Sequence, residues 1–297
     1  MKILVTGASG FIGGHVVDNL LARGHEVIAF DHKENHDRRD GVTHFLGDTR
    51  DFTSIAEAVA ISDGVIHLAG VLGTQETIEE PRPAVETNII GGLNVFQAIK
   101  HYKVPGVYIA VGNHFENNSY SISKTTAERF AFMFNKEHGT RIAVVRGLNA
   151  YGPRQKSHPV RKIMPNFCIP AINGEPITIY GDGEQVMDMV FVKDLAEILV
   201  RALLLPHGIY DKVFEAGPGK DTTVNDIANL VMQETMFQTG MVGPEPNHTP
   251  MRPGETPGVV VKANTETLEK IFTESEFTPL GLGIAYTVAY YKDILKV

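Results

Sequence analysis

The chain has 297 residues, of which 43% are hydrophobic and 21% are charged, as in globular proteins with one large or two modest domains. Its net charge of −8 argues against binding to nucleic acid or to an anionic membrane. No stretch approaches the roughly 20 apolar residues that span a bilayer. The start predicts a strand rather than a signal peptide. A single cysteine, Cys168, excludes an internal disulfide and favours a cytoplasmic location.

The first predicted strand, residues 2–6, is followed by a glycine-rich turn and a helix over residues 11–23, which Gly24 is expected to end. The turn contains three glycines at three-residue spacing: Gly7, Gly10 and Gly13. They allow a sharp turn, close approach of the backbone to a pyrophosphate, and close packing of the helix on the strand. We expect this turn, with Phe11 and Ile12 at the helix N-terminus, to bind a dinucleotide.

The second predicted strand, residues 26–30, ends at Asp31, 18 residues after Gly13. A carboxylate at this place accepts hydrogen bonds from a ribose 2′-hydroxyl and repels a 2′-phosphate, so it predicts NAD rather than NADP. Two observations leave alternatives open. Asp31 could cap a turn, and the basic residues that follow could tolerate a phosphate: His32, Lys33, Arg38 and Arg39.

A strand over residues 43–46, a helix over 54–59 and a strand over 64–68 come next. Polar or small residues follow each of these strands: Asp48 and Thr49 after the first, and Leu68, Ala69 and Gly70 after the second. Small residues at a strand's carboxyl end leave room for a flat ligand, and Asp48 could accept a hydrogen bond from an adenine amino group. Each motif on its own is more often a plain turn.

A long helix over residues 84–102, a strand over 106–111, a helix over 121–138 and a strand over 141–146 complete the first half. Tyr120 and Lys124 stand four residues apart, so they share one helix face. An ammonium beside a phenol favours the phenolate and lowers the pKa of the phenol. The pair therefore predicts a tyrosine that exchanges a proton beside a hydride acceptor.

After residue 151 prolines and glycines become frequent, which predicts a smaller, loop-rich region. Residues 190–205 are expected to form a strand and a helix, and the chain to return to the sheet near residues 187–205. Residues 240–258 predict a proline-rich loop, and helices are expected at about 265–272 and 283–295. No His, Cys, Asp and Glu set has the spacing of metal ligands, so we expect no bound metal.

These motifs resemble the extended short-chain dehydrogenase/reductase family, and within it the NAD-dependent nucleotide-sugar epimerases and dehydratases that are similar to UDP-glucose 4-epimerase. The resemblance covers nearly the whole chain. The motifs that carry it are residues 6–13, Asp31, Gly47-Asp48, residues 67–70, Thr87-Asn88, residues 120–124, 146–155, 181–185, 191–195 and 252–255.

The resemblance implies an α/β fold with a Rossmann-type doubly wound parallel sheet and a smaller C-terminal α/β substrate domain. Residues 1–150 would bind NAD, with Asn88 among the contacts, and residues 151–297 would bind a nucleoside-diphosphate sugar, UDP-sugar favoured. Asn149 and Arg252 would contact the substrate diphosphate, and Lys124 the nicotinamide ribose. Residues 84–102 and 121–138 would pair with a second subunit in a homodimer.

The chain departs from the family pattern at two places. The fifth strand lacks the usual serine or threonine at its end, where Asn113 or His114 could orient the substrate hydroxyl or could simply form the turn. Met187 stands where relatives commonly carry an arginine. Arg154 or Lys156, in the basic segment 154–162, could replace that cation, or the segment could be a solvated loop.

The function that these residues favour is epimerisation of a nucleoside-diphosphate sugar at carbon 4. Tyr120 would remove the 4-hydroxyl proton while hydride passes to NAD, and a transient 4-keto sugar would be reduced from its other face. One rival is a 4,6- or 5,6-dehydratase, which needs an added acid and an added base. Glu116 is a carboxyl group in the short loop between the fifth strand and Tyr120. Another rival is a relative that binds NAD without turnover.

Overall fold

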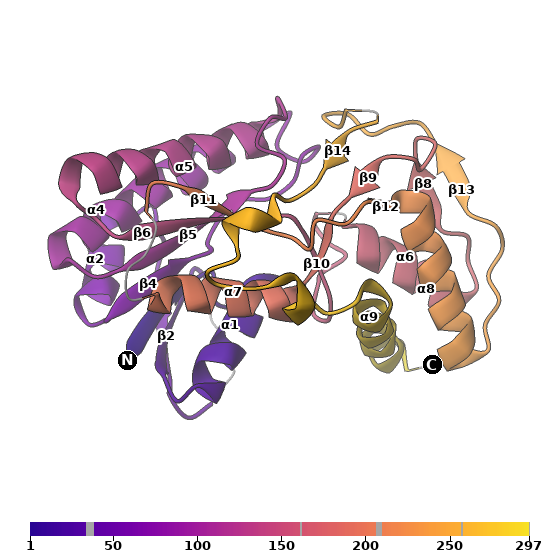
Figure 1. Cartoon of the computed structure of the whole chain (residues 1–297), viewed down its shortest axis with the longest axis horizontal. Coiled ribbons are helices and arrows are strands. Elements are labelled where there is room, and N and C mark those ends of the chain that lie inside the picture. The colour runs from indigo at the N-terminus through magenta and orange to yellow at the C-terminus, as the bar shows by residue number, and fades with distance from the viewer. Residues whose placement is uncertain (34–38, 161, 206–209, 257, 297) are drawn as a thin grey trace.

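A seven-stranded parallel sheet forms the first lobe of the computed structural model, which describes residues 1–33, 39–160, 162–205, 210–256 and 258–296 (Figure 1). The strand order is β11-β6-β5-β4-β1-β2-β3. The strands are β1 (Lys2–Thr6), β2 (Glu26–Asp31), β3 (Val42–Leu46), β4 (Gly64–His67), β5 (Gly106–Val111), β6 (Ile142–Gly147) and β11 (Val213–Ala216). The predicted doubly wound sheet is therefore confirmed, and its order reverses between β1 and β4.

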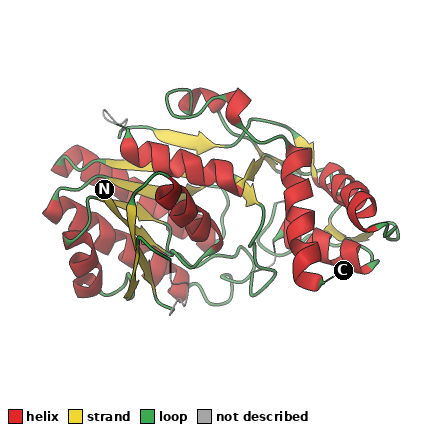
Figure 2. Ribbon diagram, turned by 90° about the horizontal axis from the view of Figure 1, so that it is seen from below, coloured by secondary structure: helices red, strands yellow, loops and turns green. Residues whose placement is uncertain are grey.

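Helices cover both faces of this sheet (Figure 2). Helices α1 (Phe11–Ala22) and α7 (Val192–Leu204) share one hydrophobic core with the sheet. Helices α2 (Phe52–Ala60), α4 (Gly92–Tyr102) and α5 (Ser119–His138) share the core on the opposite face. Because both faces are covered, the strands are almost wholly apolar and read as β-branched runs in the sequence.

The second lobe packs three helices around its own core (Figure 1). The helices are α6 (Ile163–Asn173), α8 (Val224–Thr239) and α9 (Leu280–Leu295). Short strands surround them: β7 (Asn149–Tyr151), β8 (Thr178–Tyr180), β9 (Val186–Met187), β10 (Met189–Phe191), β12 (Thr222–Thr223), β13 (Asn247–Thr249) and β14 (Val260–Val261). None of the described helices is both long and apolar enough to cross a bilayer.

The helix expected over residues 84–102 is interrupted. A short helix α3 (Arg82–Ala84) leads into a π-helical segment η1 (Val85–Gly91) before α4 begins. A π-helical insertion changes which side chains face the protein interior. In η1 it places Asn88 against the loop after β4, where it is buried.

The second half of the chain corrects several sequence expectations. The strand of segment 190–205, β10, pairs with β7 rather than with the central sheet, while Val190 of β10 and helix α7 share the hydrophobic core of that sheet. The strand that returns to the sheet is β11. Residues 265–272 form a single 3₁₀ turn, η2 (Thr265–Thr267), and turns rather than a helix. Helices α6 and α8, in contrast, occupy segments that read as loop-rich.

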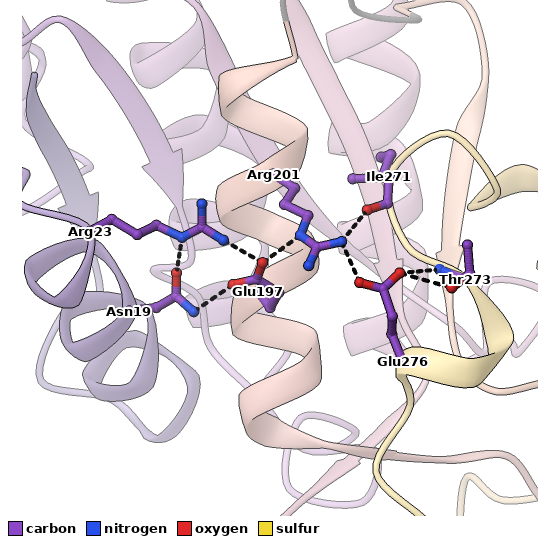
Figure 3. Close-up of polar contacts among 7 residues, drawn as sticks. All are labelled: Asn19, Arg23, Glu197, Arg201, Ile271, Thr273 and Glu276. Carbon is purple, nitrogen blue, oxygen red and sulfur yellow. Dashed lines mark hydrogen bonds and ion pairs between the residues drawn. The ribbon is translucent and has the colours of Figure 1, made fainter.

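A polar network joins the first lobe to the chain's last third (Figure 3). Glu197 of α7 accepts hydrogen bonds from Arg23 and Asn19 of α1 and from Arg201, one turn further along α7. Arg201 also donates to the Ile271 carbonyl (2.9 Å) and to Glu276 (2.7 Å). This network holds the segment that contains Ile271 and Glu276 on α7, just before the chain enters α9.

Candidate active site

A cleft of about 1020 Å³ lies between the two lobes, at the carboxyl ends of the central strands. The residues that follow β1, β2, β3, β4, β5 and β6 all contribute to its wall: Gly7, His32, Gly47, Leu68, Gly112 and Leu148. The second lobe contributes residues from α6, β8, β9 and the segment 251–261. In open α/β sheets this edge, beside the point where strand order reverses, is where ligands bind.

The glycine turn has the close-packed geometry that the sequence predicted. Gly7 has a φ of +70°, a conformation that favours glycine, and its N–H donates to the Phe30 carbonyl at 2.9 Å. A Cβ atom on Gly13 would lie 2.1 Å from the Gly7 carbonyl oxygen. Phe11, Ile12 and the three glycines all line the cleft. The turn therefore exposes backbone N–H groups where a side chain would block a phosphate.

Asp31 lies at the rim of the same cleft, at the end of β2. One oxygen of its carboxylate accepts from the Ser9 N–H (3.0 Å), and the other accepts from the Lys33 N–H (3.2 Å). These bonds fix the carboxylate between two loops, beside the glycine turn, as the NAD prediction requires. Arg39 instead pairs with Asp18, and the predicted contribution of Arg38 lies outside the described residues.

Asp48 and Thr49 also line the cleft, after β3. The Asp48 carboxylate is held by the Arg50 guanidinium, with Nη2 to Oδ2 at 2.6 Å. This side-chain hydrogen bond lowers the pKa of Asp48 although burial raises it. Thr49 is buried, and Asn94 donates to its carbonyl at 2.9 Å. The adenine contact of Asp48 stays a prediction.

The loop after β4 is held by two buried side chains. Thr6 Oγ1 accepts from the Leu68 and Ala69 N–H groups at 3.2 Å and hydrogen-bonds His67 Nδ1 at 2.7 Å. Asn88 accepts from the Val71 N–H at 2.8 Å, with its NH₂ group donating to the Val71 carbonyl. Leu68, Ala69 and Gly70 therefore face the cleft in a fixed arrangement.

Asn88 has a different position from the one expected. Its neighbour Thr87 is among the residues that line the cleft, whereas Asn88 joins the Val71 backbone to Ser123 Oγ of α5 at 2.9 Å. We therefore interpret Asn88 as a residue that holds the loop after β4 against α5, the helix that carries Tyr120.

Tyr120 and Lys124 lie in the cleft wall on α5, whose first turn is capped by Asn118. Burial raises the pKa of Tyr120 to about 12 and lowers that of Lys124 to about 7, while Glu128 acts to raise the latter. Lys124 Nζ lies 4.3 Å from the centroid of the Tyr108 ring. The expected lowering of the Tyr120 pKa is thus not found, because burial of the phenol disfavours its charged form.

Asn113 and His114, the two residues proposed to replace the absent serine or threonine, lie in different surroundings in the loop after β5. Asn113 lines the cleft. His114 is exposed, its Nδ1 is 3.1 Å from the Gly112 carbonyl oxygen, and it is not among the described residues that line the cleft. Glu116, two residues later, is buried in the wall. Of the two residues proposed from sequence, only Asn113 is therefore placed to meet a substrate.

The cations of the basic segment 154–162 also differ in whether they line the cleft. Arg154 pairs with Asp18 of α1 at 2.8 Å and is not among the described residues that line the cleft. Lys156 and Lys162 do line it. Burial lowers the pKa of Lys162, Glu76 raises it and Arg252 lowers it again. Lys156, which the sequence proposed, and Lys162 are therefore the described cations of this segment that line the cleft, where either could replace the arginine missing at Met187.

Arg252 and Asn149 both line the cleft, and their contact with a substrate diphosphate stays a prediction. Arg252 lines the cleft, with its guanidinium 4.9 Å from the Tyr180 ring centroid and paired with Glu255. Asn149 lines the cleft and donates to the Asp188 carbonyl at 3.3 Å. Both side chains are thus oriented by neighbours and accessible from the cleft.

Polar atoms without partners concentrate in this cleft. Five buried side-chain atoms of its wall have no hydrogen-bond partner among the described residues: Ser9 Oγ, Ser121 Oγ, Gln155 Oε1, Gln185 Oε1 and Arg252 Nε. A buried polar group without a partner costs free energy comparable to a lost hydrogen bond. The cleft wall therefore contains several polar groups that its own residues leave unpaired. Ser9 and Ser121 were missed because a lone serine beside a motif carries no sequence signal of its own.

Fold and cleft together define an enzyme that binds a dinucleotide beside a tyrosine–lysine pair. A family model, "NAD dependent epimerase/dehydratase family", matches residues 3–217. UDP-N-acetyl-alpha-D-glucosaminuronate decarboxylase from Bacillus cytotoxicus is 27% identical over 267 residues, covering 81% of this chain and 82% of that protein.

Two solved UDP-glucose 4-epimerases are similar over almost the whole chain. The enzyme from Thermotoga maritima with UDP-glucose has a TM-score of 0.89 and 28% identity, and covers 99% of this chain and 100% of its own. The enzyme from Thermus thermophilus with NAD has a TM-score of 0.85 and 27% identity, covering 98% and 99%.

The chain belongs to the NAD-dependent epimerase/dehydratase family, which the sequence motifs predicted. Its cofactor is NAD. The structure fits this cofactor, because the glycine turn, Ser9 and Asp31 all line the cleft and the buried Ser9 Oγ has no hydrogen-bond partner among the described residues. The family includes epimerases, dehydratases and decarboxylases of nucleotide sugars, so the reaction of this chain needs a separate argument.

Proposed function

We propose that this chain is an NAD-dependent 4-epimerase of a nucleoside-diphosphate sugar, with a UDP-sugar favoured. The observation that carries the proposal is the cleft itself. It brings Tyr120 and Lys124 from the first lobe together with Asn149 and Arg252, and its wall holds five polar atoms that lack partners. The two similar epimerases, aligned over nearly the full chain, support the same assignment.

NAD supplies the hydride acceptor in this reaction, and the protein's residues supply the proton chemistry. Tyr120, as a phenolate, takes the proton of the sugar 4-hydroxyl, becomes a neutral phenol and later returns that proton. Lys124 carries positive charge beside the phenol when protonated, and its pKa of about 7 allows that charge to change near neutral pH. Asn113 and Ser121 offer hydrogen bonds to the sugar hydroxyl in place of the absent serine or threonine.

Arg252 and Lys162 are proposed to hold the substrate diphosphate. Substituting either by alanine is expected to raise KM by about tenfold or more, since a hydrogen bond to a charged group is worth roughly 1.5–3 kcal/mol. Steady-state kinetics measure the effect. Arg154→Ala is the matched control, because Arg154 pairs with Asp18 outside the cleft wall. If Arg154→Ala raised KM and the two other variants did not, Arg154 would be the residue that holds the diphosphate.

Product analysis tests the proposed reaction. The purified protein, supplied with NAD and UDP-glucose, is expected to yield an epimer of unchanged mass, resolved from the substrate by chromatography and identified by its proton spectrum. A product lighter by one water would identify a dehydratase. A protein that binds UDP-glucose and NAD and leaves both unchanged would contradict an epimerase of that sugar.

A dehydratase is the second candidate, favoured by one observation. Glu116 is buried in the cleft wall, four residues before Tyr120, where a carboxyl group could serve as the added base. The arrangement still lacks a second described acid at the strand end, where Gly112 and Asn113 stand. We therefore keep the epimerase as the conclusion.

The assembly and location remain proposals. A homodimer through α4 and α5 would cover apolar side chains such as Ile122 and Met133, which are 52% and 37% exposed. The mass in solution measures the assembly. The cytoplasmic location rests on the composition of the chain.

A further inference from the structure

Glu116 is a buried carboxylate that the proposed epimerisation does not use. It is 9% exposed and lies on the short loop between β5 and α5, where its N–H donates to the Asn113 carbonyl at 3.1 Å. The loop has only seven residues between Val111 and Ser119. Four residues of chain separate Glu116 from Tyr120, so their Cα atoms lie within about 14 Å of each other.

Only one oxygen of this carboxylate has a partner. Oε2 accepts from Thr256 Oγ1 of the second lobe at 3.1 Å. In the described part of the chain, Oε1 has no hydrogen-bond partner, and no lysine or arginine pairs with Glu116. The two cations nearby have carboxylates of their own: Arg252 pairs with Glu255, and Lys162 interacts with Glu76.

The contact with Thr256 places Glu116 where the two lobes meet. Asn118, on the same loop, lies with its Nδ2 3.5 Å from the Gly254 carbonyl oxygen. Both contacts join the loop before α5 to segment 254–256, which lines the cleft. Glu116 lines the same cleft, so a ligand that bridges the lobes would share this cavity with the free oxygen of Glu116.

We propose that Glu116 determines which sugar is bound. Its free oxygen accepts a hydrogen bond from a hydroxyl or amino group of the sugar, and its charge disfavours a sugar that carries a carboxylate. A buried carboxylate without a cation repels a second carboxylate strongly, because little solvent screens the pair. Specificity of this kind comes from a repulsive element as much as from an attractive one. The inference rests on the proposed function, since it assumes a nucleotide sugar.

Binding to the NADH-loaded protein tests this inference without turnover, because the reduced cofactor cannot accept hydride. Calorimetry would compare UDP-glucose with UDP-glucuronic acid. The wild-type protein is expected to bind UDP-glucose at least about tenfold more tightly, and Glu116→Gln is expected to reduce this ratio to within about threefold. The change should come mainly from a gain in affinity for UDP-glucuronic acid.

Two further variants keep the result interpretable. Glu116→Asp retains the charge and should retain the preference, which guards against an effect of misfolding. Glu80→Gln removes the same charge from an exposed glutamate and should change nothing. Equal affinities in the wild-type protein, or a ratio that Glu116→Gln leaves unchanged, would overturn the inference. If neither UDP-sugar binds and UDP does not compete, the proposed function itself fails.

Discussion

Replacing Tyr120 with phenylalanine is expected to slow oxidation of the sugar by about 10²–10⁴-fold, the usual contribution of a positioned acid–base group. The ring stays in the cleft wall and only the hydroxyl is lost, so NAD and the sugar nucleotide should still bind. In the ligand-free protein burial raises the pKa of this phenol to about 12, so the hydroxyl is protonated at neutral pH. A positive charge placed beside it would lower that pKa and favour proton transfer.

The measurement is a single turnover, followed by the near-ultraviolet absorbance of reduced nicotinamide, with affinities measured separately by calorimetry. Tyr102→Phe is the matched control, because Tyr102 is 39% exposed at the end of α4 and loses the same hydroxyl. Full turnover by the Tyr120 variant would show that another group moves the proton, and the mechanism proposed for this cleft would be wrong.

Substituting Gly13 by alanine is expected to cost the protein both stability and its cofactor. The added Cβ would lie 2.1 Å from the Gly7 carbonyl oxygen and 2.9 Å from Ala8 Cα, which are backbone atoms that cannot rotate away. Overpacking of this kind costs typically 1–3 kcal/mol of unfolding free energy, and immobile neighbours place Gly13→Ala at the upper end or beyond. Moving the helix away from β1 also displaces the N–H groups that face the diphosphate, so NAD affinity should fall by about tenfold or more.

Gly14 offers a control one residue further along α1. A Cβ there would meet only Arg154 Nη1, at 3.3 Å, the end of a flexible side chain. Alanine is favoured over glycine inside a helix by up to about 1 kcal/mol, so Gly14→Ala should leave NAD binding intact and raise stability slightly. Urea unfolding and NAD titration measure both variants. Equal behaviour of the two variants would contradict the role assigned to the Gly13 packing.

The parts of the fold that were predictable are those fixed by neighbouring residues. The β1 strand, the glycine turn and α1 could be placed because a turn of this kind needs glycine at a positive φ and at close contacts, and both lie within residues 7–13. Tyr120 and Lys124 could be paired because helix geometry alone relates them. Asp31 could be placed because it ends the strand beside that turn.

The remainder depended on contacts between distant segments. The pKa values of Tyr120 and Lys124 are set by burial between α5 and the sheet, which no local pattern reveals. Arg154 was a reasonable phosphate ligand by type, but its partner Asp18 is 136 residues earlier in the chain. Helix α6 could not be predicted because proline is typical of loops and the helix contains Pro165 and Pro170. Pro165 lies in the first turn, where its missing N–H costs no hydrogen bond.

The seventh strand has a consequence for how this protein can be divided. Because β11 is supplied by residues 213–216 and pairs with β6 from Val144 to Gly147, a fragment that ended after residue 151 would leave this edge of the sheet unpaired. Such an edge invites association with other chains. We therefore expect residues 1–151, when expressed alone, to associate with other chains through the exposed edge of β6.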